Sequence, residues 1–217
     1  MNLPKVASAL CLSLLVGGCA SEGGNSFFVD LFKPSSIPAN STKIDVKATQ
    51  KWMDKYEPGL RKAAKDSDLR VERRDNVLVV TAPVDPCFNV KRRPAMLMPK
   101  TLRPLTNIAK LVEHDPATAV LVIGHADSTG PEDLNRKLSL KRAQAVGAIF
   151  HMSGLNNDRL MLRGFGSDFP VAANDSSQGR ALNRRVEIIL TPKPTLIALI
   201  NRYRHPNVAL AQSKVKK

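Results

Sequence analysis

One acidic side chain, one amide and several arginines gather beside glycines in the stretch 124–187. Asp127 comes four residues after an apolar run, and Asn135 and Arg142 follow it in a segment with helical periodicity. Arg184 belongs to a second basic segment further along the chain. Basic groups that lie close together repel each other unless an anion joins them, and a carboxylate can hold an ammonium group. The pattern predicts a pocket for a small zwitterionic ligand, whose ammonium group would lie at Asp127 and whose carboxylate would lie at Arg142.

An ordinary salt bridge is the alternative interpretation of this acid and these arginines, because exposed pairs are common and contribute little to stability. The helical spacing i, i+4 and i+7 places Asn135, Ser139 and Arg142 on one face, where they can line the cleft that Asp127 borders. Glycines in the loop 124–130 suit backbone N–H groups presented to a ligand, and the basic segment near 180 adds more donors. These features favour the ligand pocket.

The elements that must position these residues follow from apolar periodicity and from turn residues. Residues 69–81 predict a β-hairpin that turns at 74–76, and the apolar run 119–123 predicts a strand buried on both faces. The other segments are helices at 45–66, 99–113 and 134–152 and strands at 159–163 and 185–190. This order predicts an α+β fold, a two-layer sandwich in which helices pack on one face of a mixed parallel and antiparallel sheet.

Several features of these elements are more specific expectations. Pro58 lies inside the first helical segment and predicts a kink or a break there. Leu102 belongs to the apolar stripe expected to face the core from the second helix. Residues 87–98 are expected to be irregular and basic, and residues 164–178 to form a loop.

The chain has 217 residues and a formal net charge of +14. Its length fits one globular domain with extensions. A charge of this size attracts polyanions such as nucleic acid, anionic lipid headgroups or acidic wall polymers, and it does not choose among them. A solvated basic surface without a specific partner is the alternative. Among these polyanions, we expect those of the cell envelope to be partners, and we expect no nucleic acid.

Residues 1–18 have the layout of a signal peptide, with a positive residue before the apolar run 6–16, which is too short to span a bilayer. The sequence V-G-G-C at 16–19 resembles the lipobox of bacterial lipoproteins. That resemblance implies cleavage before Cys19 and lipidation of this residue, with palmitate among the acyl chains. An ordinary secretory signal is the alternative. Ala20 stands where resembling inner-membrane lipoproteins have Asp, so the resemblance implies the outer membrane, with the protein facing the periplasm.

The rest of the chain divides by composition. Residues 19–44 are rich in Ser, Gly, Asn and Pro and predict a lipid-anchored linker, which the phenylalanine cluster 27–32 interrupts. Cys87 remains the single cysteine of the mature chain, and we expect a small buried hydrophobe rather than an intermolecular disulfide. The predicted units are a helical extension at 45–68, the main domain at 69–192 and a basic tail at 193–217.

Four motifs in a fixed order make this chain similar to the OmpA-like peptidoglycan-binding domain family. That family includes porin tails, peptidoglycan-associated lipoproteins and flagellar stator subunits. The motifs are H-A-D-x-x-G at 125–130, N-x-x-L-S-x-x-R-A at 135–143, G-F-G at 164–166 and G-R-x-x-N-R-R-V-E at 179–187. The resemblance is strong over 124–190 and implies the OmpA-like α+β sandwich.

The resemblance also implies roles for individual residues. In the family, the aspartate and the helix arginine hold the side-chain amine and carboxylate of meso-diaminopimelate in the stem peptide of peptidoglycan. In this sequence these roles correspond to Asp127 and Arg142, and the resemblance implies supporting contacts from Asn135 and Arg184. Ala126 departs from the family, which usually has threonine there, and the site thereby loses a hydroxyl.

The function that the resemblance implies is a non-catalytic outer-membrane lipoprotein that binds peptidoglycan and tethers the outer membrane to the cell wall. A wall-anchoring subunit of an envelope-spanning complex, such as a type IV secretion system or a motor, is the alternative. A wall-modifying enzyme would need a metal set or paired acids, and neither stands out in the sequence. The four histidines show no metal-ligand spacing, and we expect no cofactor.

Overall fold

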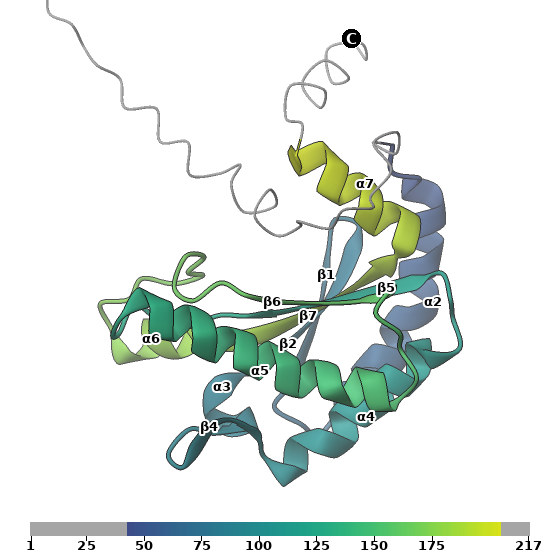
Figure 1. Ribbon diagram of the computed structural model, residues 1–217. Coiled ribbons are helices and arrows are strands. Elements are labelled where there is room, and N and C mark those ends of the chain that lie inside the picture. The colour runs from purple at the N-terminus through teal and green to yellow at the C-terminus, as the bar shows by residue number, and fades with distance from the viewer. Residues whose placement is uncertain (1–42, 205–217) are drawn as a thin grey trace, which may run out of the picture.

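The computed structural model describes residues 43–204, and a five-stranded sheet lies at its centre (Figure 1). The strand order is β1-β2-β7-β5-β6, and all neighbours run antiparallel except β5 and β6, which are parallel. The strands are β1 (Arg70–Arg74), β2 (Val77–Pro83), β5 (Thr118–Gly124), β6 (Leu160–Gly164) and β7 (Arg185–Pro192). The predicted mixed sheet is therefore confirmed.

Three long helices pack against this sheet. In Figure 1 the second and third lie on one side of it, and the first runs down to them from the other side. They are α2 (Val46–Ala64), α4 (Pro99–Glu113) and α5 (Glu132–Met152). Their apolar side chains join the sheet in one core, in which Leu60, Ile108 and Phe150 meet Val80 and Ile188. The α+β sandwich is confirmed, and α2, from the segment expected to precede the main domain, packs into the same core.

The opposite face of the sheet is covered in part by α7 (Lys193–Arg204), so the expectation that helices occupy one face only is wrong for this last helix. Leu196 of α7 packs with Leu121 and Ile123 in a second apolar cluster. The reason lies in β5, whose seven residues are all buried, because a central strand with apolar residues on both faces needs cover on both.

Two expectations about the helices are wrong. The break given as one alternative at Pro58 does not occur, because α2 continues through this residue, and the kink stays a prediction. Pro58 is exposed, whereas Tyr56 and Leu60 on either side of it are buried, and their packing holds the helix across the missing N–H group. Leu102 is 40% exposed because the buried face of α4 contains Thr101, and the next residue along a helix is turned by about 100°.

Four short elements were not predicted from the sequence. A small hairpin joins β3 (Phe88–Asn89) to β4 (Arg93–Leu97), and two short helices, α3 (Val84–Cys87) and α6 (Ser177–Asn183), flank the sheet. The hairpin has an irregular register, so it gives no alternating pattern in the sequence. Cys87 is buried and free, as predicted, and burial raises the pKa of its thiol to about 11.

The predicted signal peptide, the lipobox with Cys19 and the cluster 27–32 lie outside the described residues. The same is true of most of the predicted linker and of the end of the basic tail. Within the described part of the chain, no helix combines the length and the apolar character needed to cross a membrane.

Candidate ligand-binding site

The loop that follows β5 is fixed by backbone contacts on both sides. The N–H of His125 donates to the carbonyl of Arg185 at 2.8 Å, and the N–H of Ala126 donates to that of Gly166 at 2.7 Å. Gly124 ends β5 where α5 passes very close, since a Cβ atom at this position would lie 2.0 Å from the carbonyl oxygen of Ser139. The loop therefore leaves the strand in a direction that α5, β7 and the G-F-G turn all determine.

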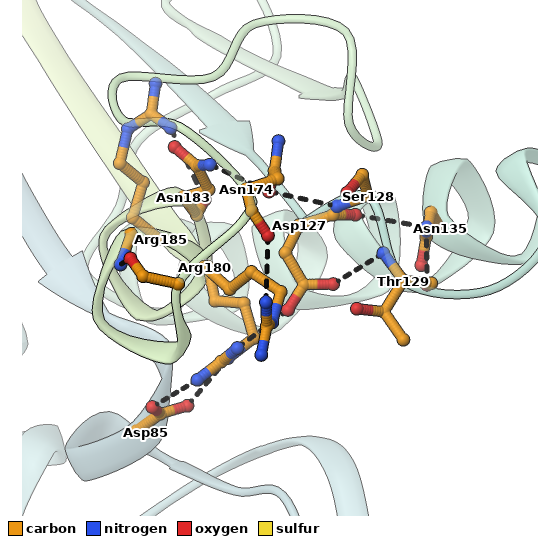
Figure 2. Close-up of polar contacts among 12 residues, drawn as sticks. Asp85, Asp127, Ser128, Thr129, Asn135, Asn174, Arg180, Asn183 and Arg185 are labelled. Atoms are coloured by element: carbon orange, nitrogen blue, oxygen red, sulfur yellow. Dashed lines mark hydrogen bonds and ion pairs between the residues drawn. The ribbon is translucent and has the colours of Figure 1, made fainter.

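Asp127 is the buried acid of this loop, with 8% of the residue exposed. Its Oδ2 accepts a hydrogen bond from Nη1 of Arg184 at 2.7 Å, and its Oδ1 accepts one from the N–H of Thr129 at 2.9 Å (Figure 2). Burial raises the pKa of the Asp127 carboxyl, but the hydrogen bonds from Arg184 and Thr129 outweigh burial and lower the pKa overall. Asp127 is thus a carboxylate at neutral pH.

Arg184 lies between two acids. Its Nε and Nη2 donate to the two carboxylate oxygens of Asp85 at 3.0 and 2.6 Å, while its Nη1 holds Asp127. The carboxylate of Asp85 raises the pKa of Arg184, and burial offsets only part of this effect. The N–H of Val84 also donates to the carbonyl of Arg184 at 2.9 Å. The forked pair therefore joins the end of β2 to the start of β7.

Asp85 was not predicted as a site residue. Its only sign in the sequence is an acid between the two prolines that end the hairpin. Its partner Arg184 is 99 positions away, and no local spacing relates the two.

Asn135, at the start of α5, holds the loop backbone. Its Nδ2 donates to the carbonyls of Asp127 and Thr129 at 3.2 and 3.0 Å (Figure 2). The predicted supporting residue therefore lies beside Asp127, and in this structure it fixes the shape of the loop.

Arg142 is the fourth predicted residue and only 4% of it is exposed. Its Nε donates to the carbonyl of Pro94 in β4 at 2.8 Å, and its guanidinium lies 5.9 Å from the ring centre of Phe88. No carboxylate among residues 43–199 forms an ion pair with it, and Asp127 pairs with Arg184 instead. Burial, and then the nearby charge of Arg184, lowers the pKa of Arg142 from 12.5 to about 10. It stays protonated at neutral pH, as a buried cation that forms no ion pair with a described residue.

The basic segment near 180 organises a loop. Arg180 donates from Nη1 to the carbonyls of Asn174 and Asp175 at 2.8 and 3.0 Å. Asn183 binds the same loop through both ends of its amide, and Asn174 accepts from the N–H of Ser128 at 3.2 Å (Figure 2). Nη1 of Arg180 and the amide of Asn183 are therefore engaged within the protein, so the expectation that the amide of Asn183 is a donor for a ligand is wrong.

Glu187 is a buried acid next to His125, at the start of the site loop. Glu187 is 5% exposed and its carboxylate lies 3.1 Å from Nε of Arg185, 3.2 Å from Nη1 of Arg74 and 3.7 Å from Nε2 of His125. Burial raises the pKa of Glu187, but contacts with His125 and Arg185 more than offset this and lower it overall. Burial lowers the pKa of His125, which is 1% exposed. His125 is thus a buried residue behind the loop, and neither of its ring nitrogens has a hydrogen-bond partner among the described residues.

No group of three or more His, Cys, Asp or Glu side chains in the described part of the chain could hold a metal ion.

The architecture matches a known class of α+β domains. A solved MotB-like protein from Desulfovibrio vulgaris has a TM-score of 0.59 at 22% identity, with 68% of this chain and 93% of that chain covered. That likeness shows the fold. The cell wall anchor of the T6SS from Pseudomonas aeruginosa has a TM-score of 0.50 at 27% identity, with 70% of this chain and 99% of that chain covered.

Residues 93–184 match the OmpA family, and the chain therefore carries an OmpA-family domain, as the motifs indicated. Its relatives include "Probable lipoprotein YiaD" of Escherichia coli K12, which is 36% identical over 141 residues, 65% of this chain and 64% of that protein. "Outer-membrane lipoprotein YfiB" of Pseudomonas aeruginosa is 39% identical over 94 residues, 43% of this chain and 56% of that protein. The matched regions thus span less than two thirds of these relatives.

Proposed function

We propose that this protein binds the diaminopimelate residue of peptidoglycan stem peptides through Asp127 and Arg142, and thereby attaches the outer membrane to the cell wall. The observation that carries the proposal is the buried cation Arg142, which forms no ion pair with any described residue and lies near an ionised Asp127. A burial of this kind is unfavourable unless an anion joins the guanidinium. A ligand carboxylate supplies that anion.

The other half of the ligand is an ammonium group. Asp127 keeps its negative charge because Arg184 and Thr129 stabilise it, and Asp85 neutralises Arg184 in turn. Asp127, Asp85, Arg184 and Arg142 have no net charge together, so a zwitterionic side-chain terminus enters without adding charge to the buried site. The tether is the predicted lipid on Cys19. Relatives named as lipoproteins support this part of the proposal.

A wall-anchoring subunit of an envelope-spanning complex remains the second candidate. The likeness to the solved cell wall anchor of a secretion system supports it. The two candidates share the wall-binding site and differ in the partners. Size-exclusion chromatography of solubilised envelopes distinguishes the two candidates. A simple tether elutes alone or with wall fragments, whereas a subunit of a complex elutes with a large stable assembly. The site geometry gives no support for a wall-modifying enzyme, and release of muropeptides from sacculi by the purified protein would contradict the non-catalytic assignment.

The direct test is binding to purified sacculi, with free meso-diaminopimelate as competitor. Wild type should sediment with sacculi and be displaced by the competitor. Asp127→Ala and Arg142→Ala should remain in the supernatant. Asp54→Ala is the matched control, since Asp54 is an exposed acid that pairs with an arginine away from the site. Equal binding by wild type and both site variants would overturn the proposed site.

A further inference from the structure

The described domain also has a pocket that neither Asp127 nor Arg142 lines. It measures about 630 Å³ and is floored by side chains of β1, β2 and β7, with Val171 and Leu182 on its rim. Thr81 and Glu187 line it, whereas the neighbouring Val80 belongs to the helix-covered core. Successive residues of a strand point to opposite faces, so the pocket opens on the face away from α4 and α5. Its size is that of a small-ligand site.

Most charges in this pocket are already paired. Arg74 contacts Glu72 and Glu187, and Arg185 contacts Glu187. The remaining acids at its edge are also engaged, with Lys100 on Asp68 and Arg184 on Asp85. These groups form the walls and are not free for a ligand.

Two polar groups of the pocket remain free. Arg70 forms no ion pair with any residue in the described range, and the buried Oγ1 of Thr81 has no hydrogen-bond partner. Arg70 and Thr81 are direct partners in the register of β1 and β2. Directly opposed residues in an antiparallel pair have Cβ atoms about 5 Å apart on the same face. One guanidinium and one hydroxyl therefore point into the pocket side by side, which is the donor set for a carboxylate.

The pocket is connected to the candidate site through one residue. Asp85 lines the pocket and accepts both hydrogen bonds of the forked pair with Arg184, and Arg184 holds Asp127. The two sites thus share a wall. Apolar residues of the pocket, among them Leu69, Ala181 and Leu182, suit a short aliphatic group next to the carboxylate.

We propose that this pocket is a second subsite, in which Arg70 and Thr81 bind the terminal carboxylate of the stem peptide whose diaminopimelate lies at Asp127 and Arg142. The inference rests on the proposed function, because it names a further part of the same ligand. One peptide then bridges the Asp85–Arg184 pair and is held at both ends.

The test uses a soluble stem peptide that ends one residue after diaminopimelate, with its last carboxyl group either free or amidated. Binding to the full chain is measured by calorimetry. Wild type should bind the free acid roughly tenfold more tightly than the amide, as expected for a charge-assisted contact. The double variant Arg70→Gln/Thr81→Val should bind both peptides equally, at the affinity of the amide. Arg103→Gln changes an exposed arginine of α4 and should retain the preference.

The outcomes separate the two proposals. If Asp127→Asn weakens both peptides and wild type does not distinguish acid from amide, the subsite is wrong and the diaminopimelate site stands. A preference that survives in the double variant also overturns the subsite. If wild type binds neither peptide, the proposed function fails and the subsite fails with it. Arg70→Gln alone, at an exposed position, should reproduce most of the loss without affecting the fold.

Discussion

Replacing Arg142 with methionine should stabilise the protein and weaken its binding to the wall. Burial lowers the pKa of Arg142 from 12.5 to about 10. One pKa unit corresponds to about 1.4 kcal/mol, so burying this charge disfavours the folded state by roughly 3 kcal/mol. Methionine fills a similar volume without charge. It loses the hydrogen bond from the charged guanidinium to Pro94, which contributes about 1.5 to 3 kcal/mol, so the free energy of unfolding should not fall and should rise by up to about 1.5 kcal/mol.

Binding should change in the opposite direction. A hydrogen bond to a charged group contributes about 1.5 to 3 kcal/mol, so loss of the guanidinium should weaken binding by roughly 10- to 100-fold. Urea unfolding gives the stability, and sedimentation with sacculi at several protein concentrations gives the affinity.

Arg185 provides a matched control, because it is also buried, at 6% exposure, but has the carboxylate of Glu187 at 3.1 Å. Arg185→Met leaves that acid without its nearest partner and should lower the free energy of unfolding by about 3 kcal/mol or more. The two substitutions are chemically the same and should have opposite effects on stability. Comparable destabilisation by both would refute the view that Arg142 is an uncompensated charge. Undiminished wall binding by Arg142→Met would refute its role as the carboxylate receptor.

Three further predictions concern the loop after β5. Asp127→Asn keeps the acceptor for the N–H of Thr129 and removes the negative charge. Sacculus binding should therefore fall roughly 10- to 100-fold with little change in melting temperature. The control Asp54→Asn on α2 should bind as wild type, and equal binding by the two variants would argue against the site. Gly124→Ala places a Cβ atom 2.0 Å from a carbonyl oxygen of α5 and should lower the free energy of unfolding by about 3 kcal/mol. Gly130→Ala places its Cβ atom where nothing lies within 4 Å and, because φ is +84°, should lower the free energy of unfolding by only about 1 kcal/mol. Equal losses for the two variants in urea unfolding would contradict the close approach of α5. Burial lowers the pKa of His125 below its ordinary 6.5, so the unfolded chain binds a proton that the folded chain excludes, and the free energy of unfolding should fall as the pH drops from about 7 to 5. His125→Gln should flatten that dependence, and an unchanged slope would assign it to other groups.

The sequence was sufficient for elements whose burial follows a simple period. The apolar run at 119–123 corresponds to β5, all of whose residues are buried, and the helix predicted at 99–113 has the bounds of α4. Both segments repeat one environment along their length, so composition alone indicates them. The hairpin of β3 and β4 was missed because its irregular register leaves no alternation. The break predicted at Pro58 does not occur because packing on both sides of this residue outweighs one lost hydrogen bond.

Four residues of the candidate site were named from the sequence, but Asp85 and the pairing of the charges were not. Asp127, Asn135 and Arg142 come from one continuous segment, and the end of a strand together with one helical face brings them near each other. Which arginine holds Asp127 depends on contacts across the fold. The forked pair with Asp85 spans 99 positions and the contact of Arg142 with Pro94 spans 48, and neither distance follows from local periodicity.

The contact between α2 and α7 has a mechanical consequence. The hydroxyls of Thr49 and Thr195 lie 2.7 Å apart, and Trp52 donates to Thr118 at 2.9 Å, so the start of α2 lies at the first residue of β5. The candidate site follows the last residue of the same strand, Gly124. A pull between the wall and the segment before α2 therefore runs along the strand axis. Backbone hydrogen bonds lie across that axis, so tension loads those of β5 together in shear instead of opening them one at a time.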